Sequence, residues 1–400
     1  MKDLFALFEK EGVNSFETFK NSKLLEHPYN FTYKEGKKDT PHESLYLIHS
    51  TKNSDNRLPE VRQCNGLILE KSDNKVICGC INKVVNMDSG SQYYKGHYQR
   101  IKNYTNGDNC KVIYAEDLTV VRIYNYKSKN YVATTRCIDA SNSYWTSKKS
   151  YAELVSECID LNEKDLLPDT TYIFSLSHPE DEKIIKIHTK QLELICAFDN
   201  TDLSYLFEPI QDKKKYKGAL TLDQVIEKTF KVSFKNLTYG LLSNGELEDL
   251  KRYRGYILLI QNDMYLFDFD TFREAEKIKN NARNIDMRYL ELFIKNDMDS
   301  FYKLSYYLPS SYLRKLIHCY HNMCRYIQDI YYHRYVKKDG NANTPPEMIE
   351  NFERTLKQLH ALYLKTKTPV SYHVVHNHLV NLPAHVVYNL FEFYCGYFLL

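Results

Sequence analysis

Acidic residues, histidines and cysteines at short spacing are the first candidates for chemistry in this chain. Asp268 and Asp270 alternate along a predicted strand, so their carboxylates would share one face and could bind Mg²⁺. Two histidine-rich groups offer metal ligands, but neither has a recognised zinc spacing. The first is His318, His321 and Cys324 on one helical face, and the second is His373, His376 and His378. Core or surface histidines are the simpler interpretation of both, and the sequence predicts no metal site and no cofactor.

Short strands separated by turns fill the chain from about residue 46 to residue 270. Residues 66–70 and 75–78 are two such runs, joined by a turn at residues 72–74. Most runs are rich in β-branched and aromatic side chains, which favour strands. The other predicted strands are residues 111–114, 120–126, 131–135, 172–176, 192–198, 256–261 and 264–269. The pattern predicts a twisted antiparallel sheet.

Beyond about residue 283 the spacing of apolar residues changes from two to nearly four. Apolar side chains recur at helical spacing over residues 313–330. Thr344-Pro345-Pro346-Glu347 then offers a capping Thr, a Pro at the first helical position and a Glu three residues after the cap, which predicts a second helix. We therefore expect an α+β protein with two domains, residues 1–283 built on sheet and residues 284–400 helical. The apolar end, residues 386–400, is expected to be buried in its own core or in a partner.

The composition is that of a globular protein inside a cell. Of the 400 residues 43% are hydrophobic and 26% charged, and the net charge of +3 does not by itself indicate a nucleic-acid binder. Ten cysteines without a CxxC pair, and a start without a secretory signal, predict reduced thiols and an intracellular location. No apolar run reaches the roughly 20 residues that a membrane span needs. The 35 tyrosines suit cores and contact surfaces alike, and an AT-rich coding bias would also produce them.

Several segments match one family pattern in order. Residues 62–70, Arg-Gln-Cys-Asn-Gly-Leu-Ile-Leu-Glu, resemble a strand that ends in Arg-Gly-aliphatic-Glu, and residues 82–86 resemble Lys-Phe-Phe-Asn. Residues 135–138 are similar to Thr-Arg-Gly-Ser, and residues 172–179 to Phe-Glu-Phe-x-x-Pro. These are segments of the phage-type RNA ligases that repair tRNA, in the nucleotidyltransferase superfamily. The resemblance covers about residues 44–280 and implies a ligase-like fold.

The family reaction begins when the Lys amine of Lys-x-Asp-Gly attacks the α-phosphate of ATP and forms a covalent lysyl-AMP. Here residues 115–118, Ala-Glu-Asp-Leu, occupy that place, so Ala115 stands at the nucleophile and Leu118 at the glycine. Alanine has no group that could form the adenylate. The string Lys-Lys-Asp-Gly at residues 337–340 follows every other motif and is interpreted as chance.

Four further positions depart from the family. Ser175 and Arg254 each stand where the family has a Glu, and Asp268 and Asp270 stand where it has two phosphate-neutralising lysines. Acidic side chains there would repel a triphosphate. One engineered Lys to Ala change would not explain these replacements, so we interpret the chain as a pseudoenzyme with no catalytic residue.

Four basic residues are the candidates that the resemblance leaves for contacts with phosphate. They are Arg62, Lys83, Lys186 and Lys190, although exposed surface is the simpler interpretation of each one alone. RNA is therefore the expected nucleic-acid ligand.

We expect a catalytically inactive RNA ligase-like protein that serves as an RNA-contacting or structural subunit. Its size, ligase-like core and helical tail are similar to those of the ligase-like accessory subunits of baculovirus-type late RNA polymerases. That resemblance implies viral RNA polymerase subunits and a capping enzyme as partners and the host nucleus as location, with no role at a membrane. Two alternatives stay open. One is an ATP-dependent RNA repair ligase with an engineered Lys to Ala nucleophile, and the other is an RNA-end sensor that binds nucleotide without chemistry.

Overall fold

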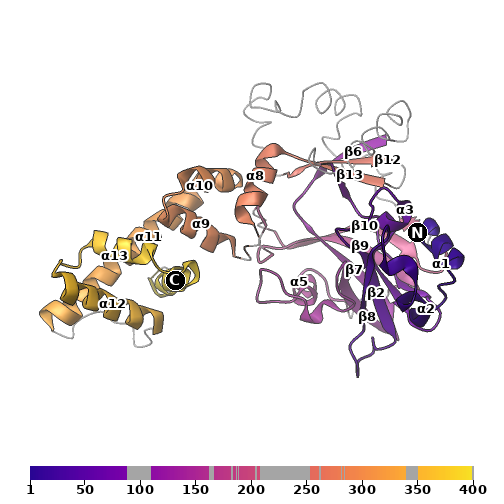
Figure 1. Cartoon of the computed structure of the whole chain (residues 1–400), viewed down its shortest axis with the longest axis horizontal. Helices are drawn as coiled ribbons and strands as arrows, with labels where there is room; N and C mark the ends of the chain where they lie inside the picture. The colour runs from indigo at the N-terminus through magenta and orange to yellow at the C-terminus, as the bar shows by residue number, and fades with distance from the viewer. Residues whose placement is uncertain are drawn as a thin grey trace. The chain divides into compact units, whose positions relative to one another are not determined.

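The computed structural model describes residues 1–87, 110–161, 166–181, 183–185, 187, 189–202, 205–207, 253–260, 263–280, 282, 284–338 and 350–398. The chain divides into two compact units, Met1–Phe272 and Arg273–Leu400. Strands dominate the first unit and helices make up the second (Figure 1), so the predicted α+β class with a helical C-terminal region is confirmed. The sequence placed the boundary after residue 283. In the structure the boundary follows Phe272, so that most of helix α8 (Asp270–Lys279) belongs to the second unit.

Three sheets carry the strands of the first unit. The first sheet has the order β1 (Phe31–Glu35), β2 (Leu45–Ser50), β3 (Asn65–Glu70), β4 (Val76–Cys78). The second has the order β11 (Tyr205–Phe207), β10 (Gln191–Asp199), β9 (Thr170–Ser177), β7 (Thr119–Tyr126), β8 (Lys129–Thr134). The third has the order β5 (Val85–Asn86), β13 (Asp263–Asp268), β12 (Gly255–Ile260), β6 (Cys110–Ala115). Among these described strands, all pairings are antiparallel except that of β5 with β13, and each predicted strand is found within two residues of its expected ends.

Alternating side chains place the first sheet between two apolar layers. Leu45 and Leu47 of β2 pack with Tyr124 and Ala133 of the second sheet, whereas Tyr46, the residue between them, packs with the N-terminal helices. Those helices are α1 (Lys2–Lys10) and α2 (Phe16–Lys20). The outer face of the second sheet is covered by α5 (Tyr151–Ser156), and α3 (Pro59–Gln63) precedes β3. The sheets therefore form a layered body with helices on both outer faces.

Arg122 of β7 is a buried guanidinium that joins the first two sheets. It is 1% exposed and donates to the backbone carbonyls of Gly66 at 2.5 Å, Gly79 at 2.9 Å and Thr134 at 2.5 Å. Gly66 has φ +93°, and a Cβ there would lie 2.6 Å from the carbonyl oxygen of Thr135. Only glycine allows this close approach, which fixes the turn that begins at Thr135.

The second unit is a set of packed helices. They are α9 (Ile285–Ile294), α10 (Met298–Leu304), α11 (Ser310–Tyr331), a π-helical turn (Tyr332–Lys337), α12 (Glu350–Thr366), α13 (Tyr372–Val380) and α14 (Ala384–Phe398). The predicted apolar face of α11 is confirmed, since Tyr320, Met323 and Ile327 are fully buried. The Thr344 cap lies outside the described residues. The C-terminal helix α14 packs on α9, α11 and α12 of its own unit. Over the described ranges, no helix is both long and apolar enough to cross a membrane.

Candidate functional site

Ala115, at the position of the family nucleophile, ends strand β6 of the third sheet. It lies opposite Gly255 of β12, is 1% exposed, and its carbonyl oxygen accepts a hydrogen bond of 2.8 Å from the backbone N–H of Arg254. A Cβ at Gly255 would lie 2.0 Å from the carbonyl oxygen of Phe267, so β12 and β13 approach closely there. The backbone holds this position firmly, and the methyl group offers nothing that could attack a phosphate.

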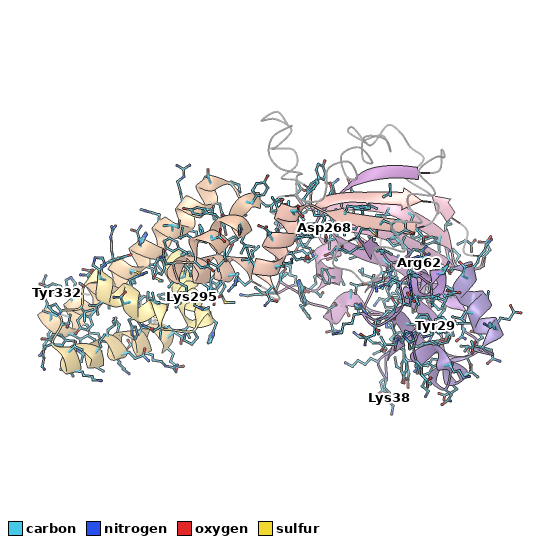
Figure 2. All side chains as sticks on the ribbon, turned by 45° about the horizontal axis from the view of Figure 1, so that its top comes forward. Tyr29, Lys38, Arg62, Asp268, Lys295 and Tyr332 are labelled. Carbon is cyan, nitrogen blue, oxygen red and sulfur yellow. The ribbon has the colours of Figure 1, made fainter. Side chains whose placement is uncertain are left out.

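Arg254 and Asp268, two of the replaced family positions, form a bidentate ion pair beside Ala115. The guanidinium Nε and Nη2 donate to the two carboxylate oxygens at 2.7 and 3.0 Å. The Asp268 side chain is fully buried (labelled in Figure 2), and it also accepts from the Asn86 amide at 3.1 Å. Relative to the family pattern the charges are exchanged, because a cation stands for the Glu and an anion for the Lys. We call Arg254 and Asp268 the inverted pair.

Asp270 does not join Asp268 on a strand face, which corrects the magnesium hypothesis. Strand β13 ends at Asp268, and Asp270 is the first residue of helix α8. The two histidine-rich groups are instead engaged with tyrosines: His376 with Tyr320 at 2.8 Å, and His321 with Tyr372 at 2.5 Å. In the part of the chain that the structure describes, no group of three or more His, Cys, Asp or Glu could hold a metal ion.

The segment after Ala115 crosses from β6 to β7 and is held by polar contacts. Asp117 accepts from the backbone N–H of Ile184 at 3.0 Å, and Thr119 donates to Asp181 at 2.7 Å. Leu118 is half-buried within this segment. Desolvation and, next, the charge of Glu193 raise the pKa of Glu116. Three carboxylates, those of Glu116, Asp117 and Asp181, therefore lie on or against this segment, and Asp181 is paired with the Lys183 ammonium at 3.3 Å.

Ser175, at the position of a family Glu, lies on β9 between Val120 of β7 and Glu193 of β10. It is 9% exposed, and its hydroxyl donates a long bond of 3.5 Å to the carbonyl oxygen of Glu193. A serine hydroxyl at this place bears no charge that could hold a ribose or a metal ion in the way a carboxylate does.

Four basic side chains lie near one another on or beside the first sheet. We call Lys34, His49, Lys83 and Arg136 the basic cluster. The Arg136 guanidinium donates to a ring nitrogen of His49, and the Lys34 ammonium donates to the Arg136 carbonyl at 2.9 Å. Lys83 is half-buried with its ammonium 3.5 Å from the Ser50 hydroxyl. The turn fixed by Gly66 places Arg136 in this group.

The basic cluster is under electrostatic strain. Burial, and next the charge of Arg136, lower the pKa of the Lys83 ammonium. Burial also lowers the pKa of His49, and the charges that add to this effect are the cations Arg136, Lys34 and Lys83. Mutual repulsion of cations disfavours their charged forms, and a bound anion would reverse that effect. The arrangement therefore suits a phosphate group.

The side chains of the other predicted phosphate contacts are not part of the basic cluster, although the carbonyl oxygen of Arg62 accepts a hydrogen bond of 2.7 Å from the backbone N–H of Lys83. Arg62 (labelled in Figure 2) is 1% exposed and forms a bidentate pair with Asp263 at 2.8 and 3.0 Å. A phosphate would therefore have to displace a buried carboxylate. Lys190 pairs with Glu157 at 2.5 Å, and Lys149, Lys190 and His178 lower the pKa of Glu157 to about 2. Lys186 lies outside the described residues. Of the four candidates, Lys83 alone is placed in the basic cluster, and sequence reasoning missed Lys34 and His49, for which no motif gave a signal.

Comparison with known proteins gives distant similarities. No family model matches the sequence. The chain is similar to the "Immediate-early protein ICP-46 homolog" of Invertebrate iridescent virus 3, at 21% identity over 268 residues, which are 65% of this chain and 56% of the relative. It thus spans little more than half of that protein. The chain has a viral relative. Among solved structures, a putative ATP-dependent DNA ligase from Aquifex aeolicus is similar over 88% of each chain at 14% identity, with a TM-score of 0.34, too low to establish a common fold.

The two side chains of the inverted pair should stabilise the first unit together, so that the effect of changing one depends on the presence of the other. Arg254→Ala leaves the buried Asp268 carboxylate without its cation and should lower the free energy of unfolding by about 3 kcal/mol. Asp268→Ala should lower it less, because the Arg254 side chain is 21% exposed and water can solvate it. The double variant should lose clearly less than the sum, with a coupling energy of at least about 1 kcal/mol. Urea unfolding followed by the fluorescence of Trp145, the single tryptophan, measures this.

The exposed pair Lys75 and Asp169, at 2.9 Å with about half of each side chain exposed, provides the matched control cycle. Its coupling energy should stay below about 1 kcal/mol, since solvent screens exposed ion pairs. Additive losses at Arg254 and Asp268 would show that these side chains do not form a stabilising pair.

Proposed function

We propose that this protein is a ligase-like protein without nucleotidyl-transfer activity that contacts RNA through the basic cluster and serves as a subunit of a viral RNA polymerase. The observation that carries the proposal is the inverted pair beside Ala115. At two positions where the resemblance leads us to expect a Glu and a Lys, the chain has a cation and an anion that neutralise each other.

Two positions support a loss of catalysis. Ala115 cannot form the covalent adenylate. Asp268 stands where a cation would stabilise phosphate charge, and its carboxylate is already satisfied by Arg254 and Asn86. A ligase inactivated only by an engineered Lys to Ala change would keep its other charged groups, so the inverted pair favours the pseudoenzyme over that alternative.

Contact with RNA is supported by the basic cluster, two of whose members, Lys83 and Arg136, lie on segments that resemble those of the ligases. Arg136 is exposed, and Lys83 and His49 have lowered pKa values that a phosphate would restore. A terminal phosphate of RNA carries more charge than an internal one, so the cluster also supports the RNA-end sensor. Binding of an RNA end and membership of a larger complex are compatible.

Membership of a viral polymerase rests on two similarities. The distant relative is a protein of an iridescent virus. The segment order and the helical C-terminal region resemble the accessory subunits of baculovirus-type late polymerases, which implies transcription as the process and the host nucleus as the location. The partners would be polymerase subunits, with RNA as a further ligand.

RNA binding should depend on the basic cluster. We expect a short single-stranded RNA with a 5′-phosphate to bind, and Lys83→Gln or Arg136→Gln to weaken binding about tenfold each, since a hydrogen bond between charged groups contributes roughly 1.5–3 kcal/mol. Binding of the same RNA with a 5′-hydroxyl end should be weakened less by either substitution. Fluorescence anisotropy with labelled RNA measures the affinities.

Lys38→Gln is the control, because Lys38 is an exposed lysine of the same unit and not a member of the basic cluster. Its affinity should match that of the unchanged protein. Equal affinities of all three variants for the phosphorylated RNA would rule out the basic cluster as its contact.

Partners should be recovered with the protein from its native host. Tagged protein isolated at low salt should carry polymerase subunits in fixed stoichiometry, identified by mass spectrometry, because a subunit without chemistry of its own acts through an assembly. The tag on an unrelated viral protein controls for carry-over. Recovery of the chain by itself would contradict the polymerase assignment and leave the RNA-end sensor as the function.

A further inference from the structure

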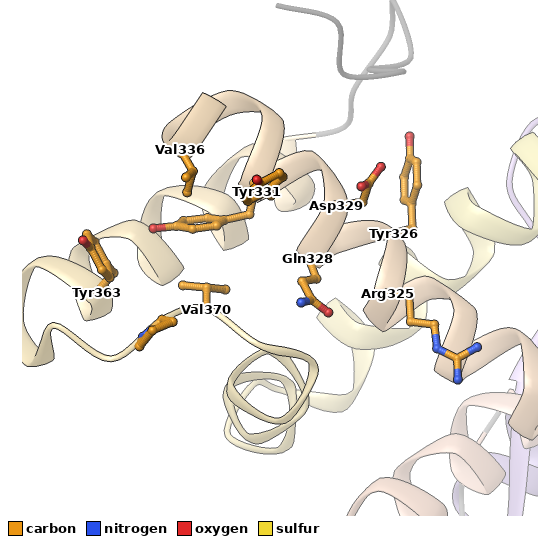
Figure 3. Close-up of a pocket in the computed structure, with 10 residues that line it drawn as sticks. Arg325, Tyr326, Gln328, Asp329, Tyr331, Val336, Tyr363 and Val370 are labelled. Atoms are coloured by element: carbon orange, nitrogen blue, oxygen red, sulfur yellow. The ribbon is translucent and has the colours of Figure 1, made fainter. Parts of the chain in front are cut away.

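The second unit contains a pocket of about 760 Å³ that no part of the proposed function uses. This volume falls within the range of roughly 300–1,000 Å³ that is usual for small-ligand sites. The pocket lies where α11, the π-helical turn, α12 and the following loop meet, and Figure 3 shows Val336 and Tyr331 on one side of it and Val370 on the other. We call it the tyrosine pocket. Four tyrosines line it: Tyr326, Tyr331, Tyr332 and Tyr363.

The tyrosine pocket combines a buried tyrosine with an exposed one that a ligand can reach. Tyr331 is 3% exposed and forms the inner wall, where its hydroxyl contacts His360 at 3.2 Å. Tyr332 is 46% exposed at the surface of the unit (Figure 2), and Val336 is 57% exposed. Both belong to the π-helical turn, a rare conformation that often occurs at functional sites.

Cations lie over the rings at the rim. The Lys337 ammonium is 5.5 Å from the centre of the Tyr332 ring, and the Lys367 ammonium is 5.9 Å from the centre of the Tyr363 ring. Both lysines are exposed, as is Lys338 at the end of the turn. Aromatic platforms next to exposed cations are the features by which proteins hold single-stranded nucleic acid without reading a duplex.

Charge is arranged unevenly along the pocket. Arg325 and Asp329 line it on α11, one helical turn apart, with Gln328 beside them. The carboxylate of Asp329 would repel a phosphate, but it could accept a hydrogen bond from a base. Gln328 and Arg325 could each donate a hydrogen bond to a base. Phosphates would therefore lie next to the two lysines. The edges of a base would face the three polar residues of α11.

We propose that the tyrosine pocket binds a base of a single-stranded nucleic acid, stacked on Tyr332, with the adjoining phosphates held by Lys337 and Lys367. The pocket holds a ligand without chemistry, because its lining offers no activated nucleophile. It belongs to the helical unit and shares no residue with the basic cluster, so it stands or fails independently of the proposed function.

Binding of single-stranded oligonucleotides with 5′-hydroxyl ends tests the proposal in the full chain. Tyr332→Ala should weaken binding about 5- to 150-fold, because stacking of a base on an aromatic ring contributes roughly 1–3 kcal/mol. Tyr332→Phe keeps the ring and should bind almost normally. Log affinity should fall as log salt rises. Lys337→Gln and Lys367→Gln should each make this negative slope shallower by about 0.7, because each removes one phosphate contact.

Tyr302→Ala is the matched control, because Tyr302 is 64% exposed on α10 of the same unit and does not line the pocket. It should leave the affinity unchanged, and circular dichroism should show every variant folded. RNA and DNA strands of one sequence distinguish the two sources of such a ligand, and binding of either that depends on Tyr332 supports the proposal.

Three results would overturn it. One is an affinity that Tyr332→Ala and Lys367→Gln both leave unchanged. Another is duplex bound as tightly as single strand. In a third, the Tyr332→Ala variant no longer co-purifies with a protein that the unchanged chain recovers, but it binds the oligonucleotide as before. The pocket would then be a contact with a protein. Because Lys83→Gln affects only the basic cluster, failure at one site is distinguishable from failure at the other.

Discussion

The ion pair between Arg254 and Asp268 is the constraint on which the site depends. A carboxylate with no solvent exposure requires a partner, and Arg254 supplies it with two hydrogen bonds while its backbone N–H bonds to Ala115. Side chain and backbone thus bind β6, β12 and the end of β13 to one another. Loss of Arg254 would leave the buried Asp268 carboxylate without its cation, so the pair preserves the sheet.

The rest of the first unit is held together by contacts that serve the fold. Arg122 bonds to three carbonyls and joins two sheets, and Gly66 lets the turn at Thr135 approach them. These contacts serve the fold, but they also place Arg136 against His49. The basic cluster is therefore a consequence of the packing of the first unit.

The alternation of apolar residues and the change of period were enough to predict the strands and the helical region. The order of motifs directed attention to positions 115, 254 and 268, which the structure places near one another on neighbouring strands. That Arg254 and Asp268 face each other could not be predicted, because it depends on the register that sets Gly255 opposite Asp268. Arg62 was expected to meet phosphate, but its partner Asp263 lies 201 residues away in the sequence. The π-helical turn follows from tertiary packing and left no pattern in the sequence.

The most direct test of the central claim is covalent labelling with ATP that carries the label on its α-phosphate, in the presence of Mg²⁺, on the unchanged chain and on Ala115→Lys. Denaturing electrophoresis then shows whether the label has become attached to the protein. The inverted pair predicts no label on either protein, since restoring the amine does not restore the cations and carboxylates around it. A labelled Ala115→Lys variant would mean that the site still binds and orients ATP, and it would contradict the account of a site whose charges have been exchanged for a structural role.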